Sequence, residues 1–315
     1  MHSPSKRIVI LATGGTIAGQ ASTSGDNVGY RAGAIAVESL VAALPQLADM
    51  PLDAEQVAQV DSKDMSHAIW QQLVLRVVHH RSREEVAGIV ITHGTDTLEE
   101  TAYLLHAVLS PGKPVVLTAA MRPATSLQAD GPQNLLDALS VARVDGPGGV
   151  VVVMGGRVYA ADGLRKVDGY RVEAFEAGEG GPVAVVEEGR VRNLRAWPVP
   201  LGLGEARIAG DVGRWPRVAW ITSHAGVDPA MVSLLVEAGF DGIVVAGTGN
   251  GTVHAELEPE LQNARSAGVA IRLTSRCAQG RIVGTAGHVV SGAAGPAQAR
   301  VELLLDLLGR RLGLV

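Results

Sequence analysis

The chain has 315 residues, of which 47% are hydrophobic, 19% charged and 3% aromatic. This composition is typical of an aliphatic α/β interior and excludes a disordered or disulfide-stapled chain. The formal net charge of −5 offers no basic footprint, so we expect no nucleic acid partner. Because this length exceeds what one hydrophobic core usually organises, two domains are expected.

Cysteine and apolar patterning limit the setting of the protein. Cys277 is the only cysteine, which excludes an intrachain disulfide and a cysteine-based metal cluster, and we expect a partly buried, passive thiol. The apolar stretch after the first residues is shorter than the core of a signal peptide. No apolar run reaches the roughly 18 residues of a membrane span. We therefore expect a cytoplasmic protein with no membrane partner.

In the first half of the chain, short runs rich in valine and isoleucine alternate with helical patterns. The runs predict strands and the spacings of three and four predict helices. Such alternation predicts a larger N-terminal domain with a mainly parallel sheet flanked by helices. The strands are expected at residues 7–12, 56–60, 88–92, 114–118 and 149–154, and the helices at 66–80, 98–108 and 131–142.

The second half begins with weaker patterning. From about Gly155 hairpins and loops are expected, and residues 193–215, with several prolines and glycines, predict a linker. Regular alternation then resumes and predicts a smaller C-terminal α/β domain. We expect an N-terminal domain at 1–192 and a C-terminal domain at 216–315, the latter with strands at 217–222, 242–246 and 269–274 and helices at 229–238, 258–267 and 296–312.

Two glycine-bearing turns present threonine side chains where predicted strands end. One turn covers residues 13–19 and the other residues 92–97, about eighty residues later. In an open parallel sheet, ligands bind at the carboxyl ends of the strands. Both turns could therefore face one small molecule. A nucleotide is disfavoured because neither turn has a phosphate-loop or dinucleotide fingerprint.

Threonine is a weak nucleophile at neutral pH and needs a base or a proton relay within hydrogen-bond reach. Thr95 beside Asp96, together with Lys166 from the loop at 162–166, offers a set that could carry acyl transfer by the logic of a catalytic triad. Asp96 could instead cap the helix that begins near Thr97. Thr13, Thr16 and Thr97 could likewise satisfy turn or cap positions.

Longer motifs decide between these interpretations. They are TGGTIAG at 13–19, ITHGTDTLEET at 91–101, AMRP at 120–123 and ADGPQNL at 129–135, followed by GTGNG at 247–251 and Ser275-Arg276. Together they resemble the bacterial L-asparaginase family with a threonine nucleophile, over nearly the whole chain. The resemblance implies an amidohydrolase that converts L-asparagine to L-aspartate and ammonia and needs no metal or other cofactor. A glutaminase-asparaginase and a binding protein that retains the fold are the alternatives.

The resemblance also implies catalytic roles. Thr16 matches the nucleophile, and Tyr30 matches the tyrosine of a mobile loop, here within residues 19–33, that closes over it. Thr95, Asp96 and Lys166 match the second threonine and its partners.

Substrate binding is implied for a further set. Ser62 and Asp96 match residues that hold the α-carboxylate and α-amino groups, and Thr95 lies with them. Ala120 falls where a main-chain carbonyl meets the side-chain amide of the substrate. Asn250 fits an asparagine that relatives supply to the site of a neighbouring subunit, so a homo-oligomer, a dimer or a tetramer, is implied.

Two positions depart from the family pattern. Lys63 stands where a glutamine or glutamate usually contacts the substrate; it could favour a carboxylate there or point into solvent. Residues 277–292 contain no acidic side chain, so no equivalent can be assigned to the glutamate that relatives supply beside the asparagine.

Overall fold

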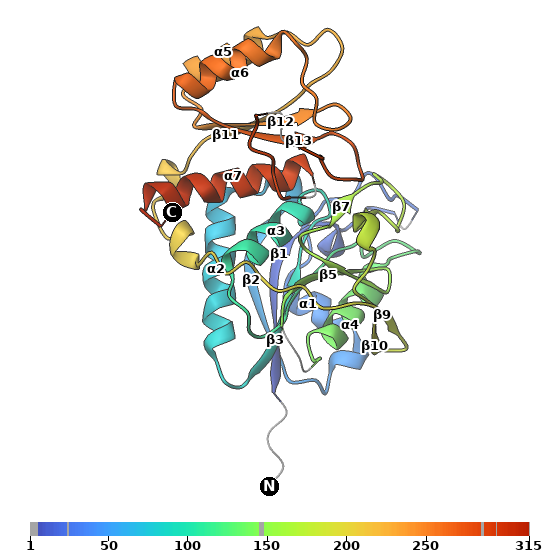
Figure 1. Ribbon diagram of the computed structural model, residues 1–315. Coiled ribbons are helices and arrows are strands. Elements are labelled where there is room, and N and C mark those ends of the chain that lie inside the picture. The colour runs from blue at the N-terminus through green and yellow to red at the C-terminus, as the bar shows by residue number, and fades with distance from the viewer. Residues whose placement is uncertain (1–5, 24, 145–147, 285–286, 294, 315) are drawn as a thin grey trace. The chain divides into compact units, whose positions relative to one another are not determined.

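The computed structural model describes residues 6–23, 25–144, 148–284, 287–293 and 295–314. The chain divides into two compact units, Met1–Glu205 and Ala206–Val315, both of the α/β class (Figure 1). The junction between them falls inside the segment 193–215. No helix in the described part of the chain is long and apolar enough to cross a membrane.

The first unit is built on an eight-stranded sheet with the order β10-β9-β6-β5-β4-β3-β1-β2. The strands from β2 to β5 run parallel, while β6, β9 and β10 pair antiparallel. A separate hairpin joins β7 and β8. The strands are β1 (Arg7–Gly14), β2 (Leu52–Val60), β3 (Val86–Thr92), β4 (Val115–Thr118), β5 (Val150–Met154), β6 (Arg157–Ala160), β7 (Arg165–Lys166), β8 (Phe175–Glu176), β9 (Ala184–Glu187) and β10 (Arg190–Asn193).

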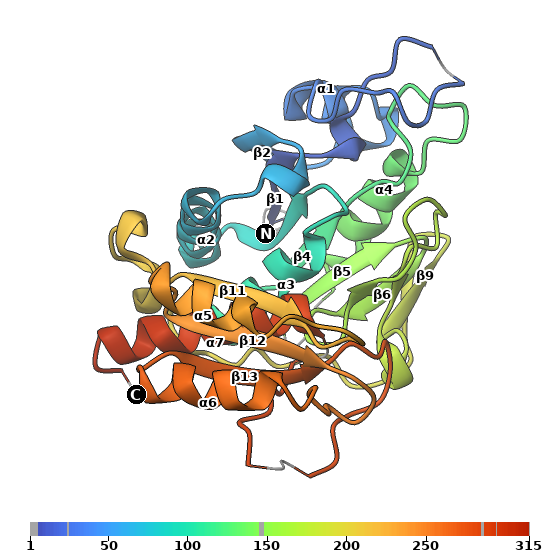
Figure 2. The same ribbon diagram turned by 90° about the horizontal axis from the view of Figure 1, so that it is seen from above.

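Helices cover both faces of this sheet: α2 (His67–Ser82) and α3 (Leu98–Val108) one face, α1 (Val37–Ala42) and α4 (Gly131–Val141) the other (Figure 2). Successive strand residues point to opposite faces. In β1, Ile8 and Ile10 accordingly pack into the core cluster that includes α4, and all residues from Ile8 to Leu11 are 0% exposed. Burial on both faces explains why the inner parallel strands β1, β3, β4 and β5 are continuous aliphatic runs.

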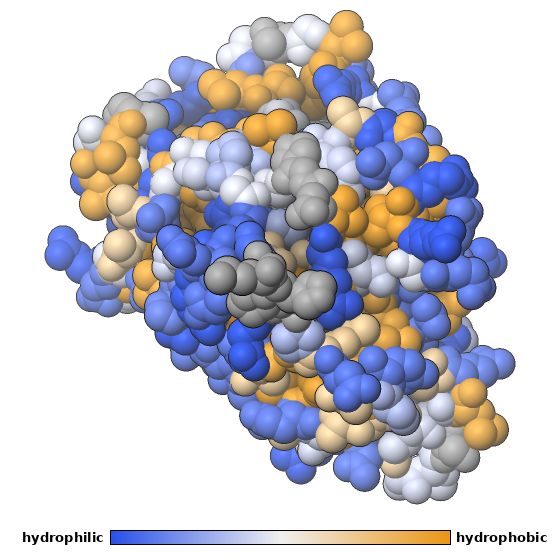
Figure 3. All heavy atoms as spheres, turned by 90° about the horizontal axis from the view of Figure 1, so that it is seen from below, coloured by the Kyte–Doolittle hydropathy of each residue, from blue (hydrophilic) through white to orange (hydrophobic). Residues whose placement is uncertain are grey.

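The register of the parallel strands brings the two glycine turns together. β1 lies between β2 and β3, with Ala12 opposite Thr92 and Gly14 opposite Val60. These three strands therefore end at the same edge of the sheet. The surface at the opposite edge, near the N-terminus, is mostly hydrophilic with separate apolar patches (Figure 3).

The second unit has a three-stranded parallel sheet of β11 (Val218–Thr222), β12 (Gly242–Gly247) and β13 (Ala270–Ser275). Apolar side chains of α5 (Ala230–Glu237) and α6 (Leu257–Ser266) form one core cluster with it, and α7 (Pro296–Arg311) forms another. A larger, mainly parallel unit and a smaller α/β unit confirm the expected fold class.

Two elements differ from the sequence-based expectation. β2 begins at Leu52 rather than at residue 56, and α1 was not expected at all. The strand β2 lies at the edge of the sheet and most of its residues are only half-buried. Its first residues alternate apolar and charged side chains, so they lack the aliphatic run that marks the buried strands.

Candidate active site

The two glycine turns touch through their backbones. Gly14 and Gly15 have φ angles of 106° and 80°, a region that favours glycine. A Cβ atom on Gly15 would lie 2.4 Å from Cα of Gly94 in the second turn. The hydroxyl of Thr13 donates a 3.0 Å hydrogen bond to the carbonyl of Thr92. Thr13 thus has the structural role, tying the first turn to the end of β3.

Thr16, at the start of a short 3-10 turn, lies under Tyr30. Its side chain is mostly buried, and Oγ1 lies 2.7 Å from the Tyr30 hydroxyl. The tyrosine ring packs so closely on Gly19 that a Cβ there would come within 2.9 Å of it. Main-chain bonds of 3.0 and 2.9 Å between Gln20 and Arg31 close the intervening loop. In this structure, Tyr30 therefore contacts Thr16 directly.

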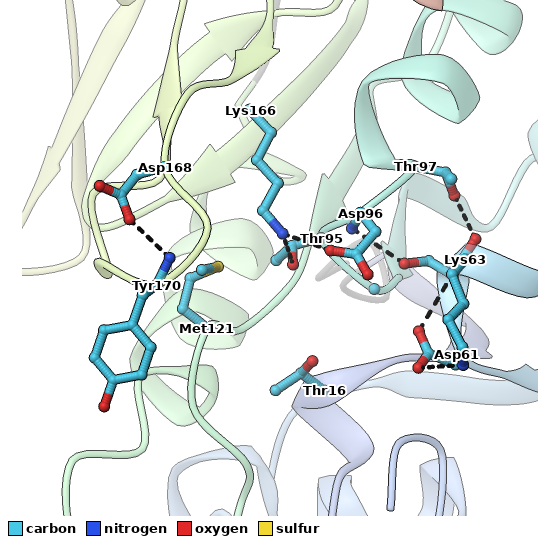
Figure 4. A network of polar contacts seen from close by, with 12 residues as sticks. Thr16, Asp61, Lys63, Thr95, Asp96, Thr97, Met121, Lys166, Asp168 and Tyr170 are labelled. Carbon is cyan, nitrogen blue, oxygen red and sulfur yellow. Dashed lines mark hydrogen bonds and ion pairs between the residues drawn. The ribbon is translucent and has the colours of Figure 1, made fainter. Parts of the chain in front are cut away.

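Lys166 joins the second turn from β7 (Figure 4). Its Nζ donates to Thr95 Oγ1 at 3.0 Å and to the Asp96 carboxylate at 2.5 Å. The main-chain N–H of Lys166 donates to Glu99 Oε2 at 2.6 Å. Burial raises the pKa of Glu99. Glu99 sits on the first turn of α3, so the same helix that follows Thr95 and Asp96 also anchors the backbone of Lys166.

Ser62 links this group to the end of β2. Its Oγ accepts the main-chain N–H of Asp96 at 3.1 Å, and its carbonyl accepts the hydroxyl of Thr97 at 2.8 Å. Thr97 is the N-cap residue of α3, and the Asp96 carboxylate binds Lys166. The interpretation of Asp96 as a helix cap is therefore wrong. Since the Ser62 oxygen acts as an acceptor, its own hydrogen can be donated to a ligand.

Lys63 lies beside Ser62, but its charge is already balanced. The side chain is 62% exposed, and Nζ pairs with Asp61 at 2.8 Å (Figure 4). It also pairs with Asp64 at 3.1 Å. The hydrogen bond to Asp61 raises the pKa of Lys63. The ammonium therefore lies with the carboxylates on either side of it, and it forms no hydrogen bond or ion pair with Thr95, Asp96 or Lys166.

A buried hydrogen-bonded chain supports the second turn from behind. Trp70 Nε1 donates to Thr101 Oγ1 at 2.9 Å. Thr101 Oγ1 in turn lies 3.0 Å from His93 Nε2, and His93 Nδ1 lies 2.7 Å from the Gly94 carbonyl oxygen. A carbonyl only accepts, so Nδ1 carries the hydrogen and Nε2 accepts from Thr101. Burial lowers the pKa of His93 to about 4. His93 is therefore a neutral brace for the turn.

Ala120 is fully buried just beyond the end of β4. Asp130 and Asn134, from the start of α4, make hydrogen bonds to the segment around it. The sequence did not indicate that either of these residues, or Glu99, supports the site. Because Asp130 directly precedes Gly131-Pro132, the sequence predicts that it caps the helix. This pattern gives no indication of its contacts with the segment around Ala120.

In the second unit, the amide of Asn250 forms two hydrogen bonds with the main chain of Val283, at 2.8 and 2.7 Å. The expectation that Cys277 is partly buried is wrong: it is exposed, because it lies in the loop that follows β13. Within the described ranges, no three or more histidine, cysteine, aspartate or glutamate side chains are grouped so that they could hold a metal ion.

Comparisons with known proteins agree with this fold. The family model Asparaginase, N-terminal matches residues 7–198, and Glutaminase/Asparaginase C-terminal domain matches residues 217–310. The chain is 37% identical to L-asparaginase 2 of Escherichia coli (strain K12) over 313 residues, which cover 95% of this chain and 88% of that protein. It is 36% identical to a glutaminase-asparaginase of Pseudomonas fluorescens biotype A over 279 residues, covering 88% and 77%.

A crystal structure of a probable cytoplasmic L-asparaginase from Campylobacter jejuni superposes with a TM-score of 0.89 at 33% identity, covering 96% of this chain and 95% of that one. Two matched domain models and relatives of this similarity define an amidohydrolase. The chain belongs to the L-asparaginase family, which confirms the resemblance found in its motifs.

Proposed function

We propose that the protein hydrolyses L-asparagine to L-aspartate and ammonia through an acyl-enzyme on Thr16. The observation that carries the proposal is the meeting of two threonine turns, each with its own polar partner. Thr16 contacts the Tyr30 hydroxyl, and Thr95 contacts the ion pair of Lys166 and Asp96. A binding protein has no use for two activated hydroxyl groups.

In the acylation step, Thr16 Oγ1 attacks the side-chain amide carbon of asparagine. The Tyr30 hydroxyl can accept the Thr16 proton while it donates its own proton to the leaving nitrogen. The carbon–nitrogen bond breaks, ammonia leaves, and an aspartyl ester forms on Thr16. Water then attacks the ester carbon. The Tyr30 hydroxyl accepts a proton from this water and donates its own proton to Thr16 Oγ1, which releases L-aspartate.

The second turn supplies polar groups for binding and charge stabilisation. Because Lys166 donates to Thr95 Oγ1, the Thr95 hydrogen remains available for the substrate or for water. A preorganised donor aimed at the oxyanion contributes roughly 3 kcal/mol. The exposed Asp96 carboxylate suits the α-ammonium group, and the Ser62 hydroxyl suits the α-carboxylate.

A glutaminase-asparaginase is the second candidate, supported by the Pseudomonas fluorescens relative of that name. The two substrates differ by one methylene, which a pocket discriminates by only about 1–3 kcal/mol. Substantial L-glutamine hydrolysis is therefore compatible with the same catalytic groups.

A homo-oligomer, with Asn250 at the site of a neighbouring subunit, is also part of the proposal. The similarity to the probable cytoplasmic L-asparaginase from Campylobacter jejuni supports a cytoplasmic location. Sedimentation should give a dimer or a tetramer as the active species. An active monomer would contradict a site shared between subunits, but it would leave the proposed role of Thr16 unchanged.

Ammonia release from L-asparagine, D-asparagine and L-glutamine tests the proposal. The native chain should release ammonia from L-asparagine, and Thr16→Ala and Thr95→Ala should each lose at least about a hundredfold in kcat. Thr222→Ala, on β11 of the second unit, is the matched control and should retain activity. Full activity of Thr16→Ala would exclude the assigned nucleophile, and binding without turnover by the native chain would favour a binding protein.

A further inference from the structure

Asp130 stands at the N-cap position of α4 but does not cap the helix. Aspartate is common there because its carboxylate can accept main-chain N–H groups of the first turn. Asp130 makes no such bond. Its Oδ1 and Oδ2 lie 3.1 and 3.0 Å from the N–H of Met121, and Oδ1 accepts the N–H of Arg122 at 2.9 Å. The carboxylate therefore holds the segment after β4.

Asn134, one turn further along α4, holds the carboxylate in place. Its Nδ2 donates to Asp130 Oδ2 at 3.1 Å and to the Ala119 carbonyl at 3.0 Å, and its Oδ1 accepts the N–H of Gly155 at 3.0 Å. Asn134 is 2% exposed, so these bonds are shielded from water. Such shielding strengthens a satisfied polar network and makes it rigid.

The carbonyls of this segment are used unequally. Ala119 O accepts from Asn134, and Met121 O accepts from Arg122 Nη1 at 3.2 Å. Between them, the carbonyl of Ala120 accepts no hydrogen bond from any residue that the structure describes, although Ala120 is 0% exposed. A buried main-chain acceptor is unfavourable without a donor. A donor from a ligand would satisfy it.

The planar peptide explains how Asp130 acts on this carbonyl. The Ala120 C=O and the Met121 N–H belong to one peptide unit and point in opposite directions. By fixing the N–H, Asp130 fixes the direction of the C=O. The Ala120 side chain also lies near the first turn, because a Cβ on Gly131 would fall 3.4 Å from Ala120 Cβ and 2.9 Å from Ile17 Cγ1, and Ile17 follows Thr16.

We propose that Asp130 is a positioning residue that orients the Ala120 carbonyl to accept a hydrogen bond from the side-chain amide N–H of the substrate. The inference rests on the proposed hydrolysis of L-asparagine and adds a specificity device to it: a carbonyl acceptor selects an amide over an ester, which has no N–H to donate.

The test compares L-asparagine with L-aspartic acid β-methyl ester in the full chain. Both substrates would give the same aspartyl ester on Thr16, but only the amide can donate to Ala120. In Asp130→Asn, the side-chain amide places N–H donors where N–H groups of the loop and Asn134 already point. We expect kcat/KM for L-asparagine to fall about tenfold, the equivalent of one ordinary hydrogen bond, and kcat/KM for the ester to fall less than about threefold.

Asp137→Asn, on the same helix, is the matched control, because among the described residues the Asp137 carboxylate accepts a hydrogen bond only from Gln133 Nε2. It should leave the amide-to-ester ratio unchanged. If Asp130→Asn does not fold, Asp130→Ser, with a smaller acceptor that also suits a helix start, should give the same selective loss. Equal losses on both substrates, or no loss on L-asparagine, would overturn the role of Asp130. A native chain that hydrolyses neither substrate would instead refute the proposed function.

Discussion

Gly15 and Gly94 lie in backbone contact where the two threonine turns cross, and neither position has room for a side chain. A Cβ on Gly15 would lie 2.4 Å from Gly94 Cα, and a Cβ on Gly94 would lie 2.5 Å from Ser62 Oγ. The glycines therefore set the separation of the two turns. In the proposed reaction hydroxyl groups on both turns reach one substrate, so we expect this contact to determine whether the site can form.

Gly94→Ala tests that contact. Its added methyl group must displace Ser62, and overpacking of this kind costs about 1–3 kcal/mol of stability. We expect chemical denaturation to show a loss of free energy of unfolding in that range. The drop in kcat/KM, expressed as a free energy, should be larger than this loss. The control is Gly210→Ala, where a Cβ meets no atom within 4 Å. Native-like activity in Gly94→Ala would show that the turns need not be this close.

Tyr30→Phe removes the hydroxyl that lies 2.7 Å from Thr16 Oγ1 but keeps the ring against Gly19. If the hydroxyl carries the proton in acylation, kcat should fall about a hundredfold, with a smaller change in KM. Tyr170→Phe is the matched control, since it preserves the ring over which the Arg122 guanidinium lies at 4.2 Å. Equal steady-state kinetics of native and Tyr30→Phe chains would exclude the proton role.

The sequence predicted the parallel strands, the paired turns and the family because these depend on local patterns. Aliphatic runs mark strands buried on both faces, and the motif around Thr16 is contiguous in the chain. α1 could not be predicted, because its six residues have no side-chain cap and only Val37 is buried. A short helix of this kind depends on tertiary packing rather than on its own propensity.

The contacts that support the site could not be predicted from local sequence patterns, because they join residues on different elements. Glu99 reaches the backbone of Lys166, 67 positions later in the chain, and Asp130 reaches backwards instead of capping α4. Both contacts depend on which elements the sheet order places side by side. The sequence indicated the residue types, but only the register and the packing of α3 and α4 define their partners.

The buried His93 predicts a pH dependence of stability. Its pKa of about 4 in the folded state lies below the ordinary value of 6.5, so the unfolded chain binds a proton more readily between these values. The contribution of neutral His93 to the free energy of unfolding is fully present above about pH 6.5. As the pH falls from 6.5 towards 4, about 3 kcal/mol of this free energy is lost. Urea denaturation across this window should show the loss in the native chain and a weaker dependence in His93→Gln. Identical slopes would contradict the neutral brace.

Lys63→Gln separates the two interpretations of this residue. Since Nζ is paired with Asp61 and Asp64 and the side chain is largely exposed, we expect KM for L-asparagine to change less than about threefold. Exposed ion pairs of this kind contribute little to stability. Steady-state ammonia release measures this KM. A change of tenfold or more would show that the ammonium turns towards the substrate.

The acyl-enzyme is the central claim, and mass spectrometry of the chain quenched in acid during turnover of L-asparagine tests it most directly. We predict one aspartyl group in ester linkage on the peptide that contains Thr16, no such adduct on the peptide that contains Thr95, and none in Thr16→Ala. An aspartyl ester on Thr95 instead, or an unmodified chain during turnover under conditions that slow deacylation, would contradict it.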